Sequence, residues 1–283
     1  MEKIDENIKL INKFKNELNI EGYSLKTIET YSMYVSLFYK FIKKDLLTIK
    51  SDDVIEYLSF LKTEKKVEST TMNLVLSAIK HFYTNFLKKD LEINIKLPKK
   101  SNKIPIVLTS KELILLLENI KNKRNKLITQ FIFSTGVRIS ECMIMKINDL
   151  DFNEYTGKVV SGKGNKDRII ILSKKWVEEY TEYLKIRNKS IISEYLFCNS
   201  QGKPLSVDTV QKFLKIASKR AGILKKVSPH TLRHSFATSL LENDVNIRYI
   251  QQLLGHSNLN TTQIYTKVNT NKLKIIKNPL DNL

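Results

Sequence analysis

The 283-residue sequence is poor in several residue types, and each shortage narrows the kind of protein it encodes. Two cysteines, Cys142 and Cys198, argue against a disulfide framework and suit a reducing cytoplasm. Only 8 glycines and 5 prolines, beside 42% hydrophobic residues, argue against a disordered chain. No apolar run approaches the roughly 20 residues that span a bilayer. The charged, periodic start MEKIDENIKL does not have the form of a signal peptide.

Acidic residues are also few relative to basic ones. The chain has 48 Lys+Arg against 29 Asp+Glu, which gives a formal net charge of +19. Such an excess raises the affinity for polyanions and speeds encounter with them. Nucleic acid is therefore the expected partner, and an anionic membrane surface is the alternative.

The first 91 residues have the apolar spacing of helices. In residues 24–44 the apolar side chains recur at spacings of three and four, at Ile28, Tyr31, Val35, Phe38 and Ile42. We predict about four helices here, with Ser24 and Ser51 as two of the N-caps. Residues 1–91 are thus expected to form a small all-α domain.

Residues 92–108 break this pattern with two prolines and the basic run KKSNK, which is typical of an extended linker. Helical spacing resumes in a second domain, residues 109–283, with Ser110 as the expected first N-cap. Within it, GKVVSGKGNKDRIIIL has two branched-chain runs about a GKGN turn and predicts a β-hairpin. The predicted fold class is mainly α with a small β-sheet.

Histidine is scarce, yet two of the four histidines lie in HTLRH, at His230 and His234. One helix face could present both to zinc, but Thr231 stands where a metalloprotease motif needs glutamate, and no Asp/Glu/Cys cluster supplies further ligands. We predict no metal. The plainer alternative is a basic helix start that packs in a core.

Four more residues stand out by their setting. Arg138 follows a glycine in TGVRISE, Lys163 lies between the glycines of the hairpin turn, His256 follows a glycine in LLGH, and Tyr265 comes nine residues later. Each alone has an ordinary explanation, as a solvated lysine, a helix cap or a core tyrosine. Together with HTLRH they form a set of cations and one phenol.

This set matches one chemistry. Cleavage of a phosphodiester must stabilise a dianionic transition state, activate a nucleophile and protonate a leaving alkoxide. Arginines can bind the non-bridging oxygens without metal, and a tyrosine becomes nucleophilic when cations and a base assist it. A lysine on a turn can act as the acid. The residues therefore predict metal-independent phosphoryl transfer through a tyrosine.

The same motifs, in this order and spacing, resemble the tyrosine recombinase (phage integrase) family. TGVRISE resembles the box of the first catalytic arginine, GKGNKDR the hairpin of the catalytic lysine, HTLRHSFAT the His-x-x-Arg box, and LLGHSNLNTTQIYTKV the box of the nucleophile. The resemblance implies a SAM-like helical core-binding domain, a linker of Xer type and an α+β catalytic domain. The catalytic set it implies is Arg138, Lys163, His230, Arg233, His256 and Tyr265.

The resemblance also implies the role of each residue. Tyr265 would form a 3′-phosphotyrosyl bond, and Lys163 would protonate the released 5′-hydroxyl. His230 would handle the tyrosine proton, His256 would bond the phosphate, and the two arginines would stabilise the charge. Glu141 is the acid usually found beside the first arginine, and His234 is expected to pack beside the site. No cofactor is implied.

Double-stranded DNA is the implied partner, and a dimer on each of two sites would form a tetramer, either of this chain or with a related recombinase. The expected DNA contacts are Lys26, Thr27, Lys166 and Arg168. The tail after Tyr265 is expected to dock into a neighbouring copy through Ile275, Ile276 and Leu280.

The size and linker resemble the Xer branch, because the sequence starts at the core-binding helices without an arm-binding domain. We therefore expect a cytoplasmic, nucleoid-associated enzyme that resolves chromosome or plasmid dimers during chromosome partition and cell division, with an FtsK-type translocase as a candidate partner. Alternatives are an integrase or transposase of a mobile element, a type IB topoisomerase-like enzyme, and a non-catalytic DNA-binding protein.

Overall fold

The chain divides into two compact units, residues 1–102 and residues 103–283. The computed structural model describes residues 2–93, 95, 97, 105–160, 167–256 and 262. Much of the predicted linker lies outside these residues. Each unit has its own hydrophobic core.

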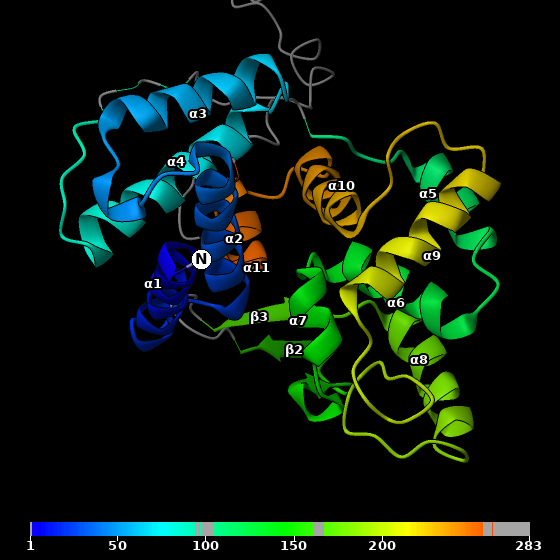
Figure 1. The fold of residues 1–283 in the computed structure, drawn as a ribbon. Coiled ribbons are helices and arrows are strands. Elements are labelled where there is room, and N and C mark those ends of the chain that lie inside the picture. Colours follow the sequence, from blue (N-terminus) through cyan, green and yellow to red (C-terminus); the bar gives the residue numbers. More distant parts are fainter. Residues whose placement is uncertain are drawn as a thin grey trace, which may run out of the picture. The chain divides into compact units, whose positions relative to one another are not determined.

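Unit 1 is helical throughout its regular structure, as the apolar spacing predicts (Figure 1). Its α-helices are α1 Glu2–Ile20, α2 Leu25–Ile42, α3 Ser51–Thr63 and α4 Ser69–Lys80. A 3₁₀ turn, Leu46–Thr48, precedes α3, and α4 continues as a π-helical segment, His81–Phe86.

Aromatic residues fill the centre of unit 1. Phe14 of α1 is fully buried and packs edge-on against Phe82, with ring centroids 5.1 Å apart. Tyr83 is also fully buried, and its hydroxyl donates to the carbonyl of Leu46 at 3.1 Å. The π-helical segment therefore presents adjacent aromatic rings to the core.

Of the three N-caps predicted from the local sequence, one is confirmed and two are wrong. Ser24 caps α2 as predicted, since its hydroxyl accepts the Thr27 N–H at 3.2 Å. The predicted caps Ser51 and Ser110 were wrong, because each is already the first helical residue. Thr109 caps α5 through a capping box with Glu112, whose carboxylate accepts the Thr109 N–H at 2.8 Å.

Unit 2 is mainly helical with one small sheet. Its α-helices are α5 Ser110–Glu118, α6 Lys123–Thr135, α7 Ile139–Ile144, α8 Lys174–Arg187, α9 Val207–Arg220, α10 Pro229–Glu242 and α11 Ile247–Leu254. Its strands are β1 Leu150–Asp151, β2 Thr156–Val159 and β3 Arg168–Ile171, and a 3₁₀ turn, Ile147–Asp149, leads into β1. The predicted fold class is confirmed.

The predicted hairpin is confirmed as the antiparallel pair β2–β3, in which Val159 lies opposite Arg168. Strand β1 adds to its other side, so the sheet order is β1-β2-β3. Ile170 points into the core of unit 2, whereas Ile169 and Ile171 are exposed. This alternation is that of a strand with one buried face.

Helix α11 packs on α10 through a small apolar cluster of its own. Ala237, Ile250 and Leu254 are fully buried there, apart from the main core. The cluster holds α11 against the second half of α10, which follows the HTLRH motif in the same helix. Within the part of the chain that the structure describes, no helix has the length and apolar character needed to cross a membrane.

Candidate active site

The TGVR motif lies at the junction of α6 and α7, and its glycine makes that junction possible. Gly136 ends α6 in the left-handed region at φ 66°. A Cβ on Gly136 would lie 2.4 Å from the Phe236 ring and 2.9 Å from Leu254 Cδ2. Glycine thus satisfies both the backbone angle and the close approach of α10 and α11.

Arg138 occupies the N-cap position of α7, and Glu141 folds back onto it. The carboxylate of Glu141 accepts the Arg138 N–H at 2.7 Å and the Arg138 Nη1 at 2.8 Å. The side chain of Arg138 is 30% exposed, so its guanidinium remains accessible at the surface of the site.

A second arginine pairs with the same carboxylate. Arg168 donates from Nη1 to Glu141 Oε1 at 3.0 Å and from Nη2 to Oε2 at 2.6 Å. Burial by itself would raise the pKa of Glu141, but the hydrogen bonds from Arg168 and from the Arg138 backbone outweigh it and hold the pKa at about 2. Glu141 is therefore a permanent anion between two guanidinium groups.

HTLRH begins α10, as its position after Pro229 suggests. The hydroxyl of Ser228 caps the helix by accepting the Thr231 N–H, and Pro229 takes the first helical position. Arg233 follows one turn later and is only 4% exposed. Its Nη1 donates to the carbonyl of Gly136 at 2.6 Å.

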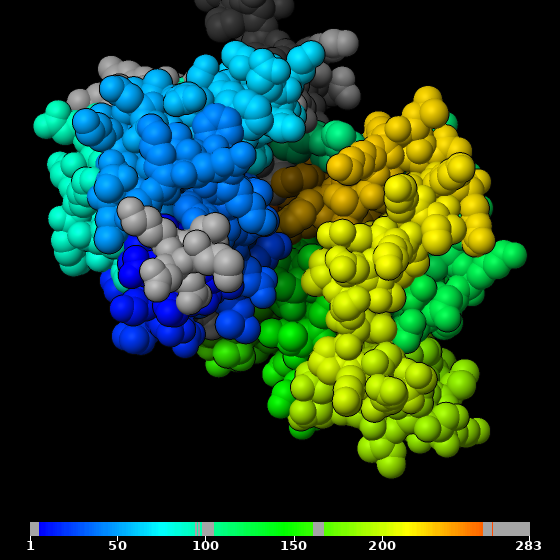
Figure 2. Space-filling model, viewed as in Figure 1, coloured from blue at the N-terminus to red at the C-terminus, as the bar shows by residue number. Residues whose placement is uncertain are grey.

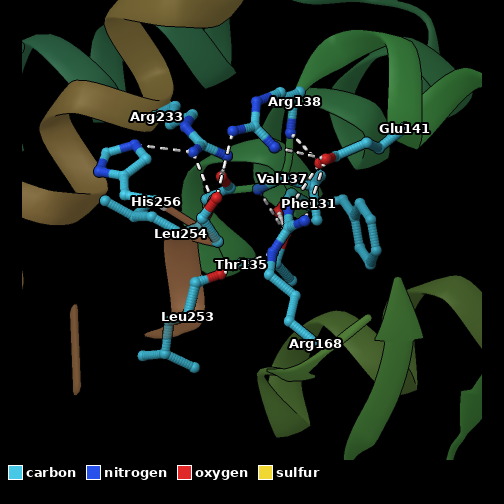
Figure 3. Close-up of polar contacts among 12 residues, drawn as sticks. Phe131, Thr135, Val137, Arg138, Glu141, Arg168, Arg233, Leu253, Leu254 and His256 are labelled. Carbon is cyan, nitrogen blue, oxygen red and sulfur yellow. Dashed lines mark hydrogen bonds and ion pairs between the residues drawn. The ribbon is translucent and has the colours of Figure 1, made fainter. Parts of the chain in front are cut away.

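The C-terminal end of α11 is where the three arginines meet (Figure 3). The carbonyl of Leu253 accepts Arg168 Nε at 2.9 Å, and that of Leu254 accepts Arg233 Nη2 at 2.7 Å. The carbonyl of Gly255 receives a longer contact of 3.4 Å from Arg138 Nη2. Successive carbonyls at one helix end thus bind three different guanidinium groups.

These bonds complete the end of the helix. The last four carbonyls of an α-helix have no partner within it. In α11 the Gln251 and Gln252 carbonyls accept the N–H groups of His256 and Gly255, and two arginines take Leu253 and Leu254. The negative end of the helix dipole also favours cations at this place.

His256 is held as a neutral imidazole. Arg233 Nη2 lies 3.0 Å from its Nε2, and because arginine can only donate, Nε2 must be the accepting nitrogen. The proton is then on Nδ1, which donates to Thr262 Oγ1 at 2.9 Å. Burial and the charges of Arg233 and Arg138 lower the pKa of His256 to about 4.

The pKa values of the other two histidines of the site, His230 and His234, are also lowered. His230 lies on the first turn of α10 and is exposed overall, although part of its ring is buried. This partial burial and the positive charges of Arg233 and Arg138 lower its pKa. His234 is half-buried, with its ring centroid 6.5 Å from that of His230. Its pKa is lowered to about 4 by burial, His230 and Arg233. At neutral pH these imidazoles are therefore uncharged.

The structure thus brings Arg138, Glu141, His230, Arg233 and His256 into one site. Lys163, Lys166 and Tyr265 lie outside the described residues, as do the tail residues Ile275, Ile276 and Leu280. Among the residues that are described, no group of three or more His, Cys, Asp or Glu could hold a metal ion.

The predicted DNA contacts have different settings. Lys26 is exposed in unit 1, and Thr27 shares a 2.8 Å hydroxyl contact with Ser24 at the start of α2. Arg168 needs a correction: it is 8% exposed and bound to Glu141 and Leu253, so it is not a surface cation. Its position after a basic turn suggested exposure, and nothing local in the sequence signals its distant partners.

Comparison with known proteins places this geometry in a family context. Residues 106–272 match the family model described as phage integrase family, and residues 10–93 match that of the phage integrase N-terminal SAM-like domain. The tyrosine recombinase XerC of Pediococcus pentosaceus is 34% identical, over 94% of this chain and 96% of that protein. The tyrosine recombinase XerA of Pyrococcus horikoshii is 38% identical, over 95% of this chain and 92% of that protein.

Two solved structures of Xer recombinases are also similar to this chain. The XerH site-specific recombinase bound to a palindromic difH substrate, in a post-cleavage complex, has a TM-score of 0.76 and 26% identity, over 97% of this chain and 87% of that one. A crystal structure of XerA recombinase has a TM-score of 0.57 and 35% identity, over 94% of this chain and 96% of that one.

We predict that Gly255→Ala destabilises the protein more than an alanine at a glycine with the same backbone angle. Gly255 has φ 64°, and its Cβ would lie 2.8 Å from Arg168 Cδ. Gly222 has φ 66° but nothing within 4 Å. Gly222→Ala should therefore cost about 1 kcal/mol for the backbone alone, and Gly255→Ala about 2 kcal/mol more for the forced displacement of Arg168. Urea unfolding of both variants measures the difference, and equal destabilisation would contradict the close packing.

We further predict that the free energy of unfolding falls as the pH drops from 6.5 towards 4. The pKa of His256 is about 4 in the folded protein against an ordinary value of 6.5. Over that interval the unfolded chain binds a proton that the folded chain does not, so acid favours unfolding. His256→Gln should make this decline shallower in urea titrations at a series of pH values. An equally steep decline in the variant would show that His256 does not titrate abnormally.

Proposed function

The chain belongs to the phage integrase family of tyrosine recombinases, and from this premise we propose that it cleaves and rejoins duplex DNA at a specific site through a 3′-phosphotyrosyl intermediate. The observation that carries the proposal is the joint attachment of Arg138 and Arg233 to the end of α11, with neutral imidazoles beside them. Such a cluster can bind a phosphate and places imidazoles beside it that can take a proton from the attacking hydroxyl.

In the proposed reaction the phenol oxygen of Tyr265 attacks the phosphorus and the bond to the 5′ oxygen breaks. The phenol proton passes to His230, whose lowered pKa keeps the ring unprotonated at neutral pH. Lys163 gives a proton to the departing 5′ oxygen. Arg138 and Arg233 bind the non-bridging oxygens where negative charge develops. For His256 to donate a hydrogen bond to the phosphate, its Nδ1–H has to leave Thr262 Oγ1 when DNA binds.

The covalent link conserves the energy of the broken bond. A 5′-hydroxyl from the same duplex or from a partner duplex attacks the phosphotyrosine and gives its proton to Lys163. The bond between phosphorus and Tyr265 breaks, and the phenol oxygen takes its proton back from His230. The cycle therefore consumes neither ATP nor any other cofactor. Attack by the hydroxyl of the partner duplex is strand exchange, which distinguishes a recombinase from an enzyme that only relaxes DNA.

We assign the chain a role of Xer type, the resolution of chromosome or plasmid dimers in the cytoplasm. Support comes from the relatives named XerC and XerA, which it matches over nearly the whole length of both chains, and from XerH, which was solved on a difH substrate. A dimer would occupy each site and two dimers would form the tetramer, with a related recombinase or an FtsK-type translocase as further partners.

A groove in unit 2 supports this assembly. It lies between the sheet and α11 and has a volume of about 1830 Å³. Ile169, Ile171 and Tyr249 line it and are each more than half exposed. The tail of a neighbouring copy, with Ile275, Ile276 and Leu280, offers an apolar surface of matching character.

DNA affinity is assigned to basic and hydroxyl side chains of both units. Lys26 and Thr27 in unit 1 and Lys166 in unit 2 remain proposed contacts. Helix α9, yellow in the space-filling view of Figure 2, adds a basic surface, because Lys212, Lys215 and Lys219 are all exposed on it. Replacement of counterions on phosphates by such side chains would supply affinity without reading sequence.

Tyr265→Phe is expected to abolish covalent capture of DNA, because it removes the attacking oxygen. The protein is incubated with fragmented host DNA without divalent metal and denatured with detergent, and protein-linked fragments are isolated and sequenced. Tyr195→Phe is the matched control, since Tyr195 is a half-buried tyrosine of the same unit that does not line the groove.

Fragments that disappear only in Tyr265→Phe would identify the nucleophile and the target site. Adducts that persist in Tyr265→Phe would refute its assignment. If the wild type gives no adduct even on duplexes nicked to block rejoining, the proposed activity is refuted and a binding function takes its place.

Alanine at Lys212, Lys215 and Lys219 together should weaken DNA binding and lower its salt dependence. For every phosphate that these lysines no longer neutralise, the slope of log affinity against log salt should fall by about 0.9. Fluorescence anisotropy over a salt series measures both effects. Lys185→Ala is the control, since Lys185 is exposed but pairs with Glu182 on α8. An unchanged slope in the triple variant would remove α9 from the DNA surface.

A further inference from the structure

Arg168 connects three separate elements of unit 2 although it is itself almost fully buried. It is the first residue of β3, its two terminal nitrogens bind both oxygens of Glu141 in α7, and its Nε donates to Leu253 at the end of α11. All three guanidinium nitrogens are therefore engaged. A planar fork of this kind fixes the orientation of the carboxylate as well as its charge.

Glu141, held in this orientation by Arg168, in turn orients Arg138. Oε1 receives both Arg168 Nη1 and Arg138 Nη1, and Oε2 receives both Arg168 Nη2 and the Arg138 N–H. Each carboxylate oxygen thus serves both arginines. Rotation of the carboxylate away from its present plane would break its hydrogen bonds to Arg138 as well as to Arg168.

Arg138 depends on this support more than Arg233 does. Arg233 is 4% exposed and is bound by the carbonyls of Gly136 and Leu254 at 2.6 and 2.7 Å. Arg138 has a side chain that is 30% exposed, and among the described residues its guanidinium bonds to Glu141 and makes a longer contact of 3.4 Å with the Gly255 carbonyl. The direction of its guanidinium is therefore set mainly by Glu141.

The place of Arg168 in the sheet adds a second link. Arg168 lies opposite Val159 in the last register pair of the β2–β3 hairpin, five residues after Lys163 in the sequence. Anchoring Arg168 to α7 and α11 fixes the start of β3 to the arginine cluster. The same side chain thus ties the hairpin to the phosphate-binding residues.

From these contacts we infer that Arg168 is a positioning residue, which acts through Glu141 to hold Arg138 in the orientation that binds the scissile phosphate. The inference deepens the proposed function and rests on it. It assigns Arg168 no contact with DNA. A buried arginine with a purely structural task would instead affect stability alone.

The chain offers a matched control for that alternative. Arg187 is 5% exposed in the same unit, and it donates to Asn188 and to the carbonyls of Ser193, Tyr195 and Leu196. Its hydrogen bonds to described residues all go to residues 180–196, away from Glu141 and the end of α11. Arg187→Gln and Arg168→Gln therefore both remove a buried guanidinium, but only the second disturbs the support of Arg138.

The first arm of the test uses the full-length protein without DNA. Nuclear magnetic resonance relaxation of the arginine Nε–H groups reports how rigidly each guanidinium is held, with Arg138→Lys to assign the signal of Arg138. We expect the Arg138 signal to become mobile in Arg168→Gln and to stay as in the wild type in Arg187→Gln. An equally rigid Arg138 in Arg168→Gln would overturn the inference, whatever the protein does with DNA.

The second arm measures single-turnover formation of the covalent adduct on a nicked duplex of the sequence recovered in Tyr265-dependent capture. We expect Arg168→Gln to slow the step about 100-fold, the size of effect that a misplaced binding group produces. The dissociation constant for DNA should stay within about twofold, because exposed cations set the affinity. Arg168→Lys, which keeps the charge and loses the fork, provides a folded variant with the same direction of change.

A double-mutant cycle separates positioning from stability. If Arg168 acts through Arg138, adding Arg168→Gln to Arg138→Ala should slow the reaction no further than Arg138→Ala alone. Fully additive effects on the rate, or a wild-type rate in both Arg168→Gln and Arg168→Lys, would overturn the inference while the wild-type adduct keeps the proposed function intact. Absence of any wild-type adduct refutes the proposed function instead, and the first arm then decides the role of Arg168.

Discussion

A buried guanidinium cannot remain without partners, and this constraint organises unit 2. Taking an arginine out of water costs several kcal/mol unless its donors are satisfied. Arg168 meets that demand with a carboxylate and a helix-end carbonyl, and Arg233 meets it with two carbonyls and an imidazole. Because these acceptors come from α6, α7 and α11, the arginines can be buried only when those elements are correctly packed around them.

The same constraint gives the site its electrical character. The cluster contains three guanidinium groups but one carboxylate, Glu141, which pairs with two of them, so it keeps an excess of positive charge. That excess, with burial, lowers the pKa values of His234 and His256 and keeps their rings neutral. Transfer of a phosphoryl group to a phenol needs a site that binds an anion and also contains unprotonated bases. This cluster combines both properties.

Two glycines let the backbone come close enough for these bonds. Gly136 ends α6 against Phe236 and Leu254, and Gly255 ends α11 against Arg168. Both have a positive φ, and both present a carbonyl to an arginine of the site. The glycines of the TGVR and LLGH motifs thus act as helix ends and contact surfaces at once. Gly136 lies two residues before Arg138, and Gly255 lies immediately before His256.

The sequence by itself determined the helical first unit, the β2–β3 hairpin, the order of the family motifs and the set of cations that a phosphate site needs. These features depend on spacing and residue type within short segments, where neighbours along the chain are also neighbours in space. Ser24 is such a case, because its cap bond reaches only three residues ahead. Ser51 and Ser110 show the limit of such local prediction. In each case the residue before the serine occupies the N-cap position.

Only the tertiary structure decided that Arg168 is buried and that α11 holds the arginines together. Glu141 and Leu253, the partners of Arg168, are 27 and 85 residues away along the chain. A basic residue after a turn carries no local sign of such partners, so its surroundings suggested a DNA contact. Burial and ion pairing depend on which distant segments the packing brings together, and that information is not contained in any one stretch of sequence.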